Sequence, residues 1–254
     1  MAGPDSPSRG LAARVTEPEL YDALAMRERG LQDLPLWQFL ASQVGEPVLE
    51  LGAGTCRVLA PLLESGIDAY GLESSTARAA SGRARLRARG LDPSRLILGD
   101  ARRWEAGAPL SLVLATFNFL ALFDDDAVGD VLSASYANLR PGGVFALEAQ
   151  VWPTPALKET WKDADPSALV VGDQTVEYVE TVSWPRGHTL RTRRRYRFPD
   201  GSSRTLVQDL HIRPIPALRR ALRSAEFEVL SPALDEHGQT PSEESRVVFL
   251  RGRR

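Results

Sequence analysis

The sequence predicts an α/β fold, with a doubly wound parallel sheet and an antiparallel β insertion. Between residues 47 and 150, short apolar strands alternate with helices, which is the pattern of βαβ units. After Gln150 the pattern changes to three longer strands, followed by a last helix–strand unit. We therefore expect a disordered tail over residues 1–16, a core over 17–150, an antiparallel insertion over 151–215, and the last helix and strands of the core over 216–254.

The elements of the core follow from apolar spacing and from glycines. Leucines at helical spacing predict helix over residues 17–40, interrupted near Gly30 and Pro35. Pro47–Leu51 is expected to be a buried strand, and the helix after it ends at Gly66. The other expected elements are strands at 67–72, 96–98, 112–117 and 144–148, helices at 75–89 and 124–139, and a turn at 140–143.

The insertion is expected to hold three strands, at 176–184, 189–198 and 203–212. The second and third are separated by Pro199-Asp200-Gly201, which is typical of a hairpin. A helix at 216–225 and short strands at 227–230 and 247–250 complete the chain.

Composition excludes several protein classes. Hydrophobic residues make up 43% and charged residues 25%, as in ordinary globular proteins. The single cysteine, Cys56, excludes an intramolecular disulfide and fits a reducing compartment. The longest apolar stretch, residues 110–123, is interrupted by polar residues and is shorter than the ~20 residues of a membrane helix. The first nine residues lack the apolar core of a secretory signal. We therefore expect a cytoplasmic protein without a membrane partner.

A glycine-rich turn after the first strand predicts a nucleoside-binding site. Gly52 and Gly54 follow the buried strand, so that a ligand can approach the backbone and the free N–H groups of the next helix. Glu50 precedes the turn, and Glu73 ends the second strand, where an acid typically binds ribose hydroxyls. Arg57 stands where the nicotinamide-cofactor fingerprint has its last glycine, which counts against NAD(P).

Four stretches of the core resemble the class I S-adenosylmethionine-dependent methyltransferases. They are Glu50-Leu-Gly-Ala-Gly-Thr, Gly71-Leu-Glu-Ser-Ser, Gly99-Asp-Ala and Leu139-Arg-Pro-Gly-Gly-Val-Phe. The resemblance covers residues 17–150 and points to the small-molecule type. It implies a Rossmann-like sheet of seven strands with the last one antiparallel, S-adenosyl-L-methionine as the cofactor, and no metal.

The resemblance also assigns cofactor-binding residues. The glycine loop would carry the methionine end, Glu73 the ribose and Asp100 the adenine amino group. An aromatic residue of the leading helix, Tyr21, would close over the cofactor or serve only in packing. The full set of expected cofactor contacts is Tyr21, Glu50, Gly52, Ala53, Gly54, Glu73, Ser74, Asp100, Ala101 and Thr116. The chain departs from the family at Cys56, which replaces a third glycine and is expected to be a small buried side chain, and at Glu73, which replaces an aspartate.

Less of the sequence bears on the methyl acceptor. Thr116-Phe-Asn-Phe lacks the Pro-Pro of the Asn-Pro-Pro-Tyr motif, which argues against adenine or glutamine N-methylation. Asn118 falls near the expected reactive methyl group, so it is a candidate catalytic residue or a polar turn residue. In small-molecule methyltransferases the insertion forms a lid over the acceptor, so His211 or Arg213 could point into the acceptor pocket, and His211 is a second candidate for acid–base or binding work.

The expected function is methylation of a small-molecule nitrogen or oxygen. The alternatives are an RNA methyltransferase and a non-catalytic S-adenosylmethionine-binding regulator. On a strand, Arg191, Arg193, Arg195 and Arg197 share one face, which is a solvated surface, a site for an anionic acceptor, or a subunit contact in a homodimer. A net charge of −2, with only two lysines, disfavours nucleic acid as a partner.

Overall fold

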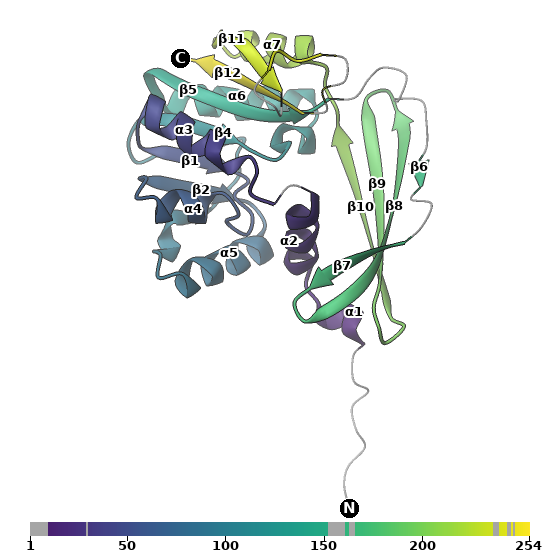
Figure 1. Ribbon diagram of the computed structural model, residues 1–254. Helices are drawn as coiled ribbons and strands as arrows, with labels where there is room; N and C mark the ends of the chain where they lie inside the picture. The colour runs from purple at the N-terminus through teal and green to yellow at the C-terminus, as the bar shows by residue number, and fades with distance from the viewer. Residues whose placement is uncertain are drawn as a thin grey trace, which may run out of the picture. The chain divides into compact units, whose positions relative to one another are not determined.

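The computed structural model describes residues 10–28, 30–151, 161–162, 166–235, 239–242, 245 and 247–254. Contacts divide the chain into two compact units, and each is described by itself. The core unit comprises Leu31–Lys158 and Leu210–Arg254, and the β unit comprises Met1–Gly30 and Glu159–Asp209 (Figure 1).

The core unit contains a seven-stranded sheet in the order β11-β12-β5-β4-β1-β2-β3. Its strands are β1 (Val48–Leu51), β2 (Ala69–Glu73), β3 (Leu96–Leu98), β4 (Leu110–Ala115), β5 (Leu139–Gln150), β11 (Glu228–Asp235) and β12 (Val247–Arg253). The first five strands pair in parallel, and β12 pairs antiparallel with both β5 and β11. The predicted doubly wound sheet and its antiparallel last strand are confirmed.

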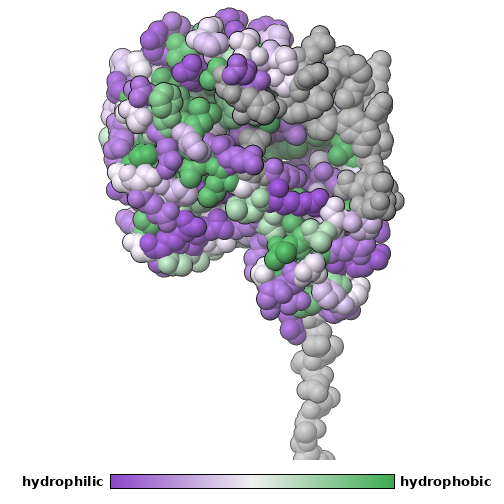
Figure 2. All heavy atoms as spheres, in the orientation of Figure 1, coloured by the Kyte–Doolittle hydropathy of each residue, from purple (hydrophilic) through white to green (hydrophobic). Residues whose placement is uncertain are grey.

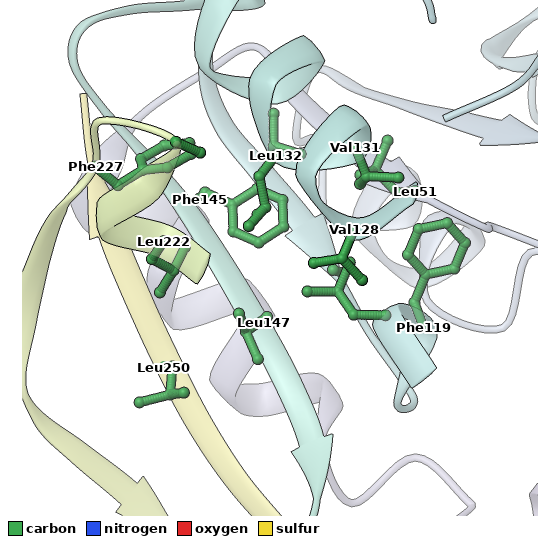
Figure 3. Close-up of a cluster of buried hydrophobic side chains, with 14 of the residues drawn as sticks. Leu51, Phe119, Val128, Val131, Leu132, Phe145, Leu147, Leu222, Phe227 and Leu250 are labelled. Carbon is green, nitrogen blue, oxygen red and sulfur yellow. The ribbon is translucent and has the colours of Figure 1, made fainter. Parts of the chain in front are cut away.

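Helices cover both faces of this sheet. They are α3 (Leu34–Val44), α4 (Leu59–Glu64), α5 (Thr76–Ala88), α6 (Asp125–Asn138) and α7 (Ile215–Ser224), with 3-10 turns η1 (Pro93–Arg95) and η2 (Phe119–Leu122). Side chains of α3, α4 and α5 form one buried cluster with the sheet, and those of α6 and α7 form another. In the second cluster, Leu132 of α6 and Leu222 of α7 lie beside Phe145 of β5 (Figure 3). Every residue of β4 is buried, as expected of a strand packed on both faces.

Two of the predicted helices begin at capping side chains. The Ser75 hydroxyl accepts a hydrogen bond from the Arg78 N–H and starts α5. The Asp124 carboxylate accepts one from the Ala127 N–H and starts α6. Each bond satisfies a backbone donor that the first turn of a helix leaves unpaired.

The β unit holds a second sheet, in the order β10-β9-β8-β6, with β7 also paired to β8. Its elements are β6 (Trp161–Lys162), β7 (Ser167–Val171), β8 (Gln174–Arg186), β9 (Thr189–Arg197) and β10 (Ser203–His211), with helices α1 (Leu11–Arg14) and α2 (Glu17–Glu28). Strands β6, β7 and β9 all pair antiparallel with β8. The three predicted strands of the insertion correspond to β8, β9 and β10, whereas β6 and β7 were not expected.

The leading segment of the chain differs from expectation. Residues 10–16, predicted as disordered tail, contain α1 and are held by the β9–β10 hairpin. The Leu11 N–H donates to the Asp200 carboxylate at 2.6 Å, and the Ala12 N–H donates to the Ser202 hydroxyl at 3.0 Å. The rest of the predicted tail, residues 1–9, lies outside the described residues. Helix α2, which we expected in the core over 17–150, buries its leucines in the hydrophobic cluster of the β unit.

The predicted turn at 140–143 is also different, because the structure includes it in β5. Leu110 pairs with Leu139, but Leu112 already pairs with Val144, so β5 carries extra residues at this point. Such an irregularity is a β-bulge, and Gly142 takes its left-handed conformation, with φ of +76°.

The surface of the β unit combines ion pairs with a small apolar groove. On β9, Arg191, Arg194 and Arg197 pair with carboxylates of the neighbouring strands. Hydrophobic residues gather over α2 and β7 (Figure 2), where Met26 and Val170 are 55% and 68% exposed and line a groove. Among the described residues, none of the helices combines the length and apolar character needed to cross a membrane.

Candidate cofactor-binding and active site

The strand order of the core unit reverses at β1, which lies between β2 and β4. In open α/β sheets, ligands bind outside the carboxyl ends of the strands at such a reversal. The predicted site residues of the core are found on the segments that follow β1, β2, β3 and β4, so they share this edge of the sheet.

The glycine loop after β1 has a backbone that few residues other than glycine adopt. Gly52, Gly54 and Cys56 have φ values of +65°, +55° and +64°. At Gly52 a side chain would also collide with Phe119, because a Cβ atom would lie 2.3 Å from the Phe119 ring. Cys56, as predicted, is fully buried. It takes the left-handed conformation at the cost, about 1–2 kcal/mol, that a residue other than glycine incurs there.

Glu73 ties the glycine loop to the start of α5. Its Oε2 accepts a hydrogen bond from the Gly54 N–H at 2.9 Å, and its Oε1 accepts one from the Ser75 N–H at 2.6 Å. We expected Glu73 to face an open cleft, but the residue is buried. Since each carboxylate oxygen can accept two hydrogen bonds, each has one acceptor position beyond these backbone contacts.

Asp100, after β3, is held by the arginine that follows it. The Arg102 guanidinium donates to both oxygens of Asp100, and these hydrogen bonds lower the pKa of Asp100 to about 2. The Gly99 N–H donates to the Glu73 carbonyl at 3.0 Å and brings the ends of β2 and β3 together. Ala101 is buried, whereas Ser74 is exposed.

A buried carboxylate lies at the end of β1. Glu50 is 3% exposed, and its Oε1 accepts a hydrogen bond from the Thr116 hydroxyl at 2.9 Å. Its Oε2 is buried and has no hydrogen-bond partner among the described residues. Burial raises the pKa of Glu50 to about 7, because the ionised form is poorly solvated there.

A buried ion pair connects the segment after the glycine loop to the start of α3. The Arg57 guanidinium donates to both oxygens of Asp33, at 2.6 and 2.8 Å, and the Trp37 indole donates to the same carboxylate at 2.9 Å. Burial acts to raise the pKa of Asp33, but its hydrogen bonds and the charge of Arg57 lower it overall. Arg57 also lies over the Phe117 ring, with its Cζ 5.2 Å from the ring centroid.

The segment after β4 is strained and tightly held. Phe117 and Asn118 have φ of +50° and +60°, and two left-handed residues other than glycine cost about 1–2 kcal/mol each, somewhat less for asparagine. The Phe117 N–H donates to the buried Glu148 carboxylate at 3.2 Å, and the Asn118 Oδ1 accepts from the Gln150 N–H at 3.0 Å. Strain of this kind occurs where the surroundings enforce it, often at functional sites.

The two other predicted site residues belong to other elements. Tyr21 is half-buried on α2, in the β unit. His211 ends β10, and its carbonyl accepts a hydrogen bond from Arg213 at 3.1 Å. The Arg213 guanidinium also donates to the Asp125 carboxylate and to the carbonyls of Leu120 and Phe123, so within the core unit it joins η2 and the start of α6 to residues 211–213.

Sequence reasoning named Arg213 only as a residue that could point into the acceptor pocket, and it missed three residues of this region: Asp33, Arg57 and Glu148. A signal existed for Glu148, since it closes the fifth predicted strand and Glu50 and Glu73 lie at the ends of the first two. Asp33 and Arg57 are 24 residues apart in the sequence, so no local pattern indicates that they pair.

Comparison with known proteins gives one family and many related folds. Residues 48–143 match the methyltransferase domain family. No curated protein matches the sequence.

Three solved structures illustrate the similarity of fold. The CcbJ methyltransferase from Streptomyces caelestis is 23% identical, with a TM-score of 0.71 over 87% of this chain and 89% of its own. CalS10, an amino pentose methyltransferase from Micromonospora echinaspora, is 22% identical, with a TM-score of 0.71 over 92% and 97%. The sugar N-methyltransferase KedS8 from Streptoalloteichus is 21% identical, with a TM-score of 0.73 over 100% and 98%.

The sheet order, the glycine loop and the family match agree with one another. The matched residues begin at the first residue of β1 and end in the bulge of β5, so they include the glycine loop and the ends of β2, β3 and β4. Residues 48–143 are therefore similar to a methyltransferase domain, and the chain shares its fold with the solved methyltransferases.

Proposed function

We propose that this protein transfers the methyl group of S-adenosylmethionine to an amine of a small molecule, such as an amino sugar or a glycoside. The observation that carries the proposal is the buried carboxylate of Glu50 at the reversal of the sheet, with an oxygen that no described residue binds. KedS8 and CalS10, described as a sugar N-methyltransferase and an amino pentose methyltransferase, support the choice of acceptor.

The residues at this edge suit the parts of the cofactor. Its methionine end carries positive charge, and the unpartnered Oε2 of Glu50 is an acceptor for it. Gly52 and Gly54 leave the backbone of the loop open to close approach. The remaining acceptor positions of Glu73 suit ribose hydroxyls, and the Asp100 carboxylate suits the adenine amino group. When bound, the cofactor supplies a methyl group on a positively charged sulfur, open to direct attack by a nucleophile.

The chain itself has to align the acceptor, exclude water and handle one proton. An amine attacks only in its neutral form, so a proton must leave it before or during transfer. We assign the proton-accepting role to the His211 imidazole. We assign acceptor positioning to Asn118, whose Oδ1 already holds the Gln150 N–H and whose amide N–H groups are the donors it can offer.

The alternative acceptors have less support. On the predicted arginine face of β9, Arg191 and Arg197 pair with Asp209 and Glu177, so carboxylates partly neutralise the strip that an RNA phosphate backbone would need. A non-catalytic binder would hold the cofactor and its product without turnover.

The test combines binding with turnover. Calorimetry with S-adenosylhomocysteine measures cofactor-site binding, and mass spectrometry detects methyl transfer to a panel of amino sugars and their hydroxyl counterparts. We expect methylation of the amino compounds only. Methylation confined to the hydroxyl compounds would contradict the amine assignment, and binding without any turnover would favour the regulator. His211→Gln should lower kcat by about 10²–10⁴-fold at unchanged S-adenosylhomocysteine affinity.

A further inference from the structure

We infer that Glu148 is a positioning residue for methyl transfer, whose buried carboxylate keeps Asn118 in its strained, left-handed conformation. This inference rests on the proposed function for the role of Asn118 toward the acceptor, and it names the residue on which that role depends. Glu148 lies on β5 and belongs to none of the stretches that resemble the methyltransferase family.

The backbone of Phe117 and Asn118 has a conformation that the chain would leave if nothing held it. Their φ values are +50° and +60°. Residues other than glycine populate this region sparsely, and a bulky aromatic residue is rarer there than asparagine. Two consecutive residues of this kind persist only where surrounding contacts enforce them. Those contacts therefore determine where the Asn118 side chain lies.

Both neighbours of β4 in the sheet hold this segment. On the β1 side, the Thr116 hydroxyl donates a hydrogen bond to the Glu50 carboxylate. On the β5 side, the Phe117 N–H donates to Oε2 of Glu148 at 3.2 Å, and the Gln150 N–H donates to Oδ1 of Asn118 at 3.0 Å. The bond to Glu148 acts on the backbone of a left-handed residue itself, whereas the other two are made by side chains of the segment.

Glu148 is placed so that its side chain continues the pairing between two strands. The register of β4 and β5 ends at Ala115 and Leu147, so Glu148 comes directly after the last backbone pair. On its other side β5 pairs with β12, and Glu148 is 2% exposed. Burying a carboxylate costs free energy that an apolar side chain of the same volume would not. Glu148 therefore contributes a polar contact rather than the space that it fills.

The held segment fixes Asn118 with respect to the glycine loop. The ring of Phe119 occupies the space beside Gly52, where a Cβ would lie 2.3 Å from the ring. On the other side of Asn118, the centroid of the Phe117 ring lies 5.2 Å from the Arg57 Cζ. The rate of a direct displacement depends on alignment, and a misplacement of about 1 Å can lower it about 10²-fold. Release of the segment should therefore lower kcat.

The first test compares Glu148→Met with Glu148→Gln in the protein without ligands. Methionine fills a similar volume but offers no oxygen, whereas glutamine retains one acceptor oxygen. Hydrogen exchange of the Gln150 amide, followed by NMR, reports whether Asn118 still holds that N–H group. We expect exchange to be about tenfold faster or more in Glu148→Met, because the segment opens more often, and to stay at the wild-type rate in Glu148→Gln.

The second test measures turnover of an amino sugar that the wild-type protein methylates. Glu148→Met should lower kcat about 10²-fold at unchanged S-adenosylhomocysteine affinity, and Glu148→Gln should retain most of kcat. In an Asn118→Ala background, Glu148→Met should lower kcat no further, because a residue that acts through Asn118 has nothing left to position.

Asp235→Leu is the matched control. Asp235 is 8% exposed and ends β11 of the same sheet, where its carboxylate accepts a hydrogen bond from the Gln239 N–H at 2.8 Å. Its loss should lower Tm but change neither kcat nor the exchange of the Gln150 amide. Glu148→Asp keeps the charge but is one methylene too short for the Phe117 N–H, so it should behave as Glu148→Met does, and it replaces that variant if methionine does not fold.

Exchange of the Gln150 amide at the wild-type rate in both Glu148→Met and Glu148→Asp would overturn the inference. So would a fall in Tm with kcat retained, which is what a purely structural role predicts, or an equal loss of kcat with and without the Asn118 side chain. If the wild-type protein methylates no amine, the proposed function is overturned, and the exchange rates still decide whether Glu148 holds Asn118.

Discussion

Replacing Glu73 by alanine removes two hydrogen bonds that hold the glycine loop against the start of α5. The carboxylate accepts them from the Gly54 and Ser75 N–H groups, at 2.9 and 2.6 Å. Hydrogen bonds to a charged group contribute about 1.5–3 kcal/mol each, so Glu73→Ala should lower the free energy of unfolding by about 3 kcal/mol or more. For a chain of this length that is about 6–12 °C in Tm.

The same change should weaken cofactor binding. Because alanine offers the ribose hydroxyls no acceptor, the affinity for S-adenosylhomocysteine should fall by about 30- to 1000-fold, or 2–4 kcal/mol, measured well below the Tm of the variant. Glu73→Gln retains one acceptor oxygen but turns an amide N–H₂ toward the second backbone donor, so it should be intermediate in both measurements.

Thermal unfolding followed by circular dichroism, and calorimetry on the folded proteins, separate the two effects. Glu64→Ala is the matched control, because Glu64 is a half-exposed glutamate of the same unit that pairs with Arg89 at the surface. It should shift Tm by no more than a surface ion pair does. A Glu73→Ala protein that melts with the wild type would show that the carboxylate does not hold the loop, and unchanged affinity would remove the ribose assignment.

Three further substitutions test separate parts of the core unit. Arg213→Met leaves buried carbonyls without a donor and should cost about 3–5 kcal/mol in urea unfolding, whereas Asp125→Asn, whose carboxylate is 92% exposed, should cost under about 1 kcal/mol. Equal losses of stability in the two variants would show that the hydrogen bonds from Arg213 to the carbonyls contribute no more than its ion pair. Gly52→Ala adds a Cβ 2.3 Å from an aromatic ring at a left-handed φ, so unfolding in urea should show a loss of about 2–4 kcal/mol, and a neutral result would refute the loop geometry. Arg102→Ala should return the pKa of Asp100 from about 2 toward its ordinary value, seen by NMR titration of the carboxyl carbon. Because the pKa of Asp100 is lowered, its stabilising effect is present above about pH 4 and is lost as the pH falls to 2. The variant should lose the part of that dependence that comes from the guanidinium, while the backbone N–H of residue 102 still donates to Asp100.

The parallel sheet could be predicted because each of its strands carries a local signal. Leu96–Leu98 was predicted to the residue, and β1, β2 and β4 were predicted within two residues at each end, whereas β5 begins five residues before the predicted strand. An apolar strand bounded by glycine, and a helix begun by a serine or aspartate, are decided within about ten residues of sequence. The bulge at 140–143 was not predicted, because Pro-Gly-Gly is as typical of a turn as of a bulged strand. Pairing of β5 with its two neighbouring strands decides between the turn and the bulge.

The site could be predicted only in part, namely where its residues carry a local signal in the sequence. Glu50 and Glu73 were identified because they end strands beside a glycine loop. That Glu73 binds the loop rather than facing an open cleft depends on a contact between residues 19 apart. The partner of α2 is farther still, since its leucines pack against strands that begin about 140 residues later. Packing at such distances depends on the complete fold and leaves no periodic trace in the sequence.

The buried thiol of Cys56 can be used to measure motion of the glycine loop. The chain has no other thiol, and this one is fully buried, with its Sγ 2.8 Å from the position that a Cβ on Gly82 of α5 would occupy. A thiol reagent can reach it only when the loop moves away from α5, so the rate of labelling measures how often that happens. The natural cysteine thus lets the rate of thiol labelling measure how often the glycine loop opens.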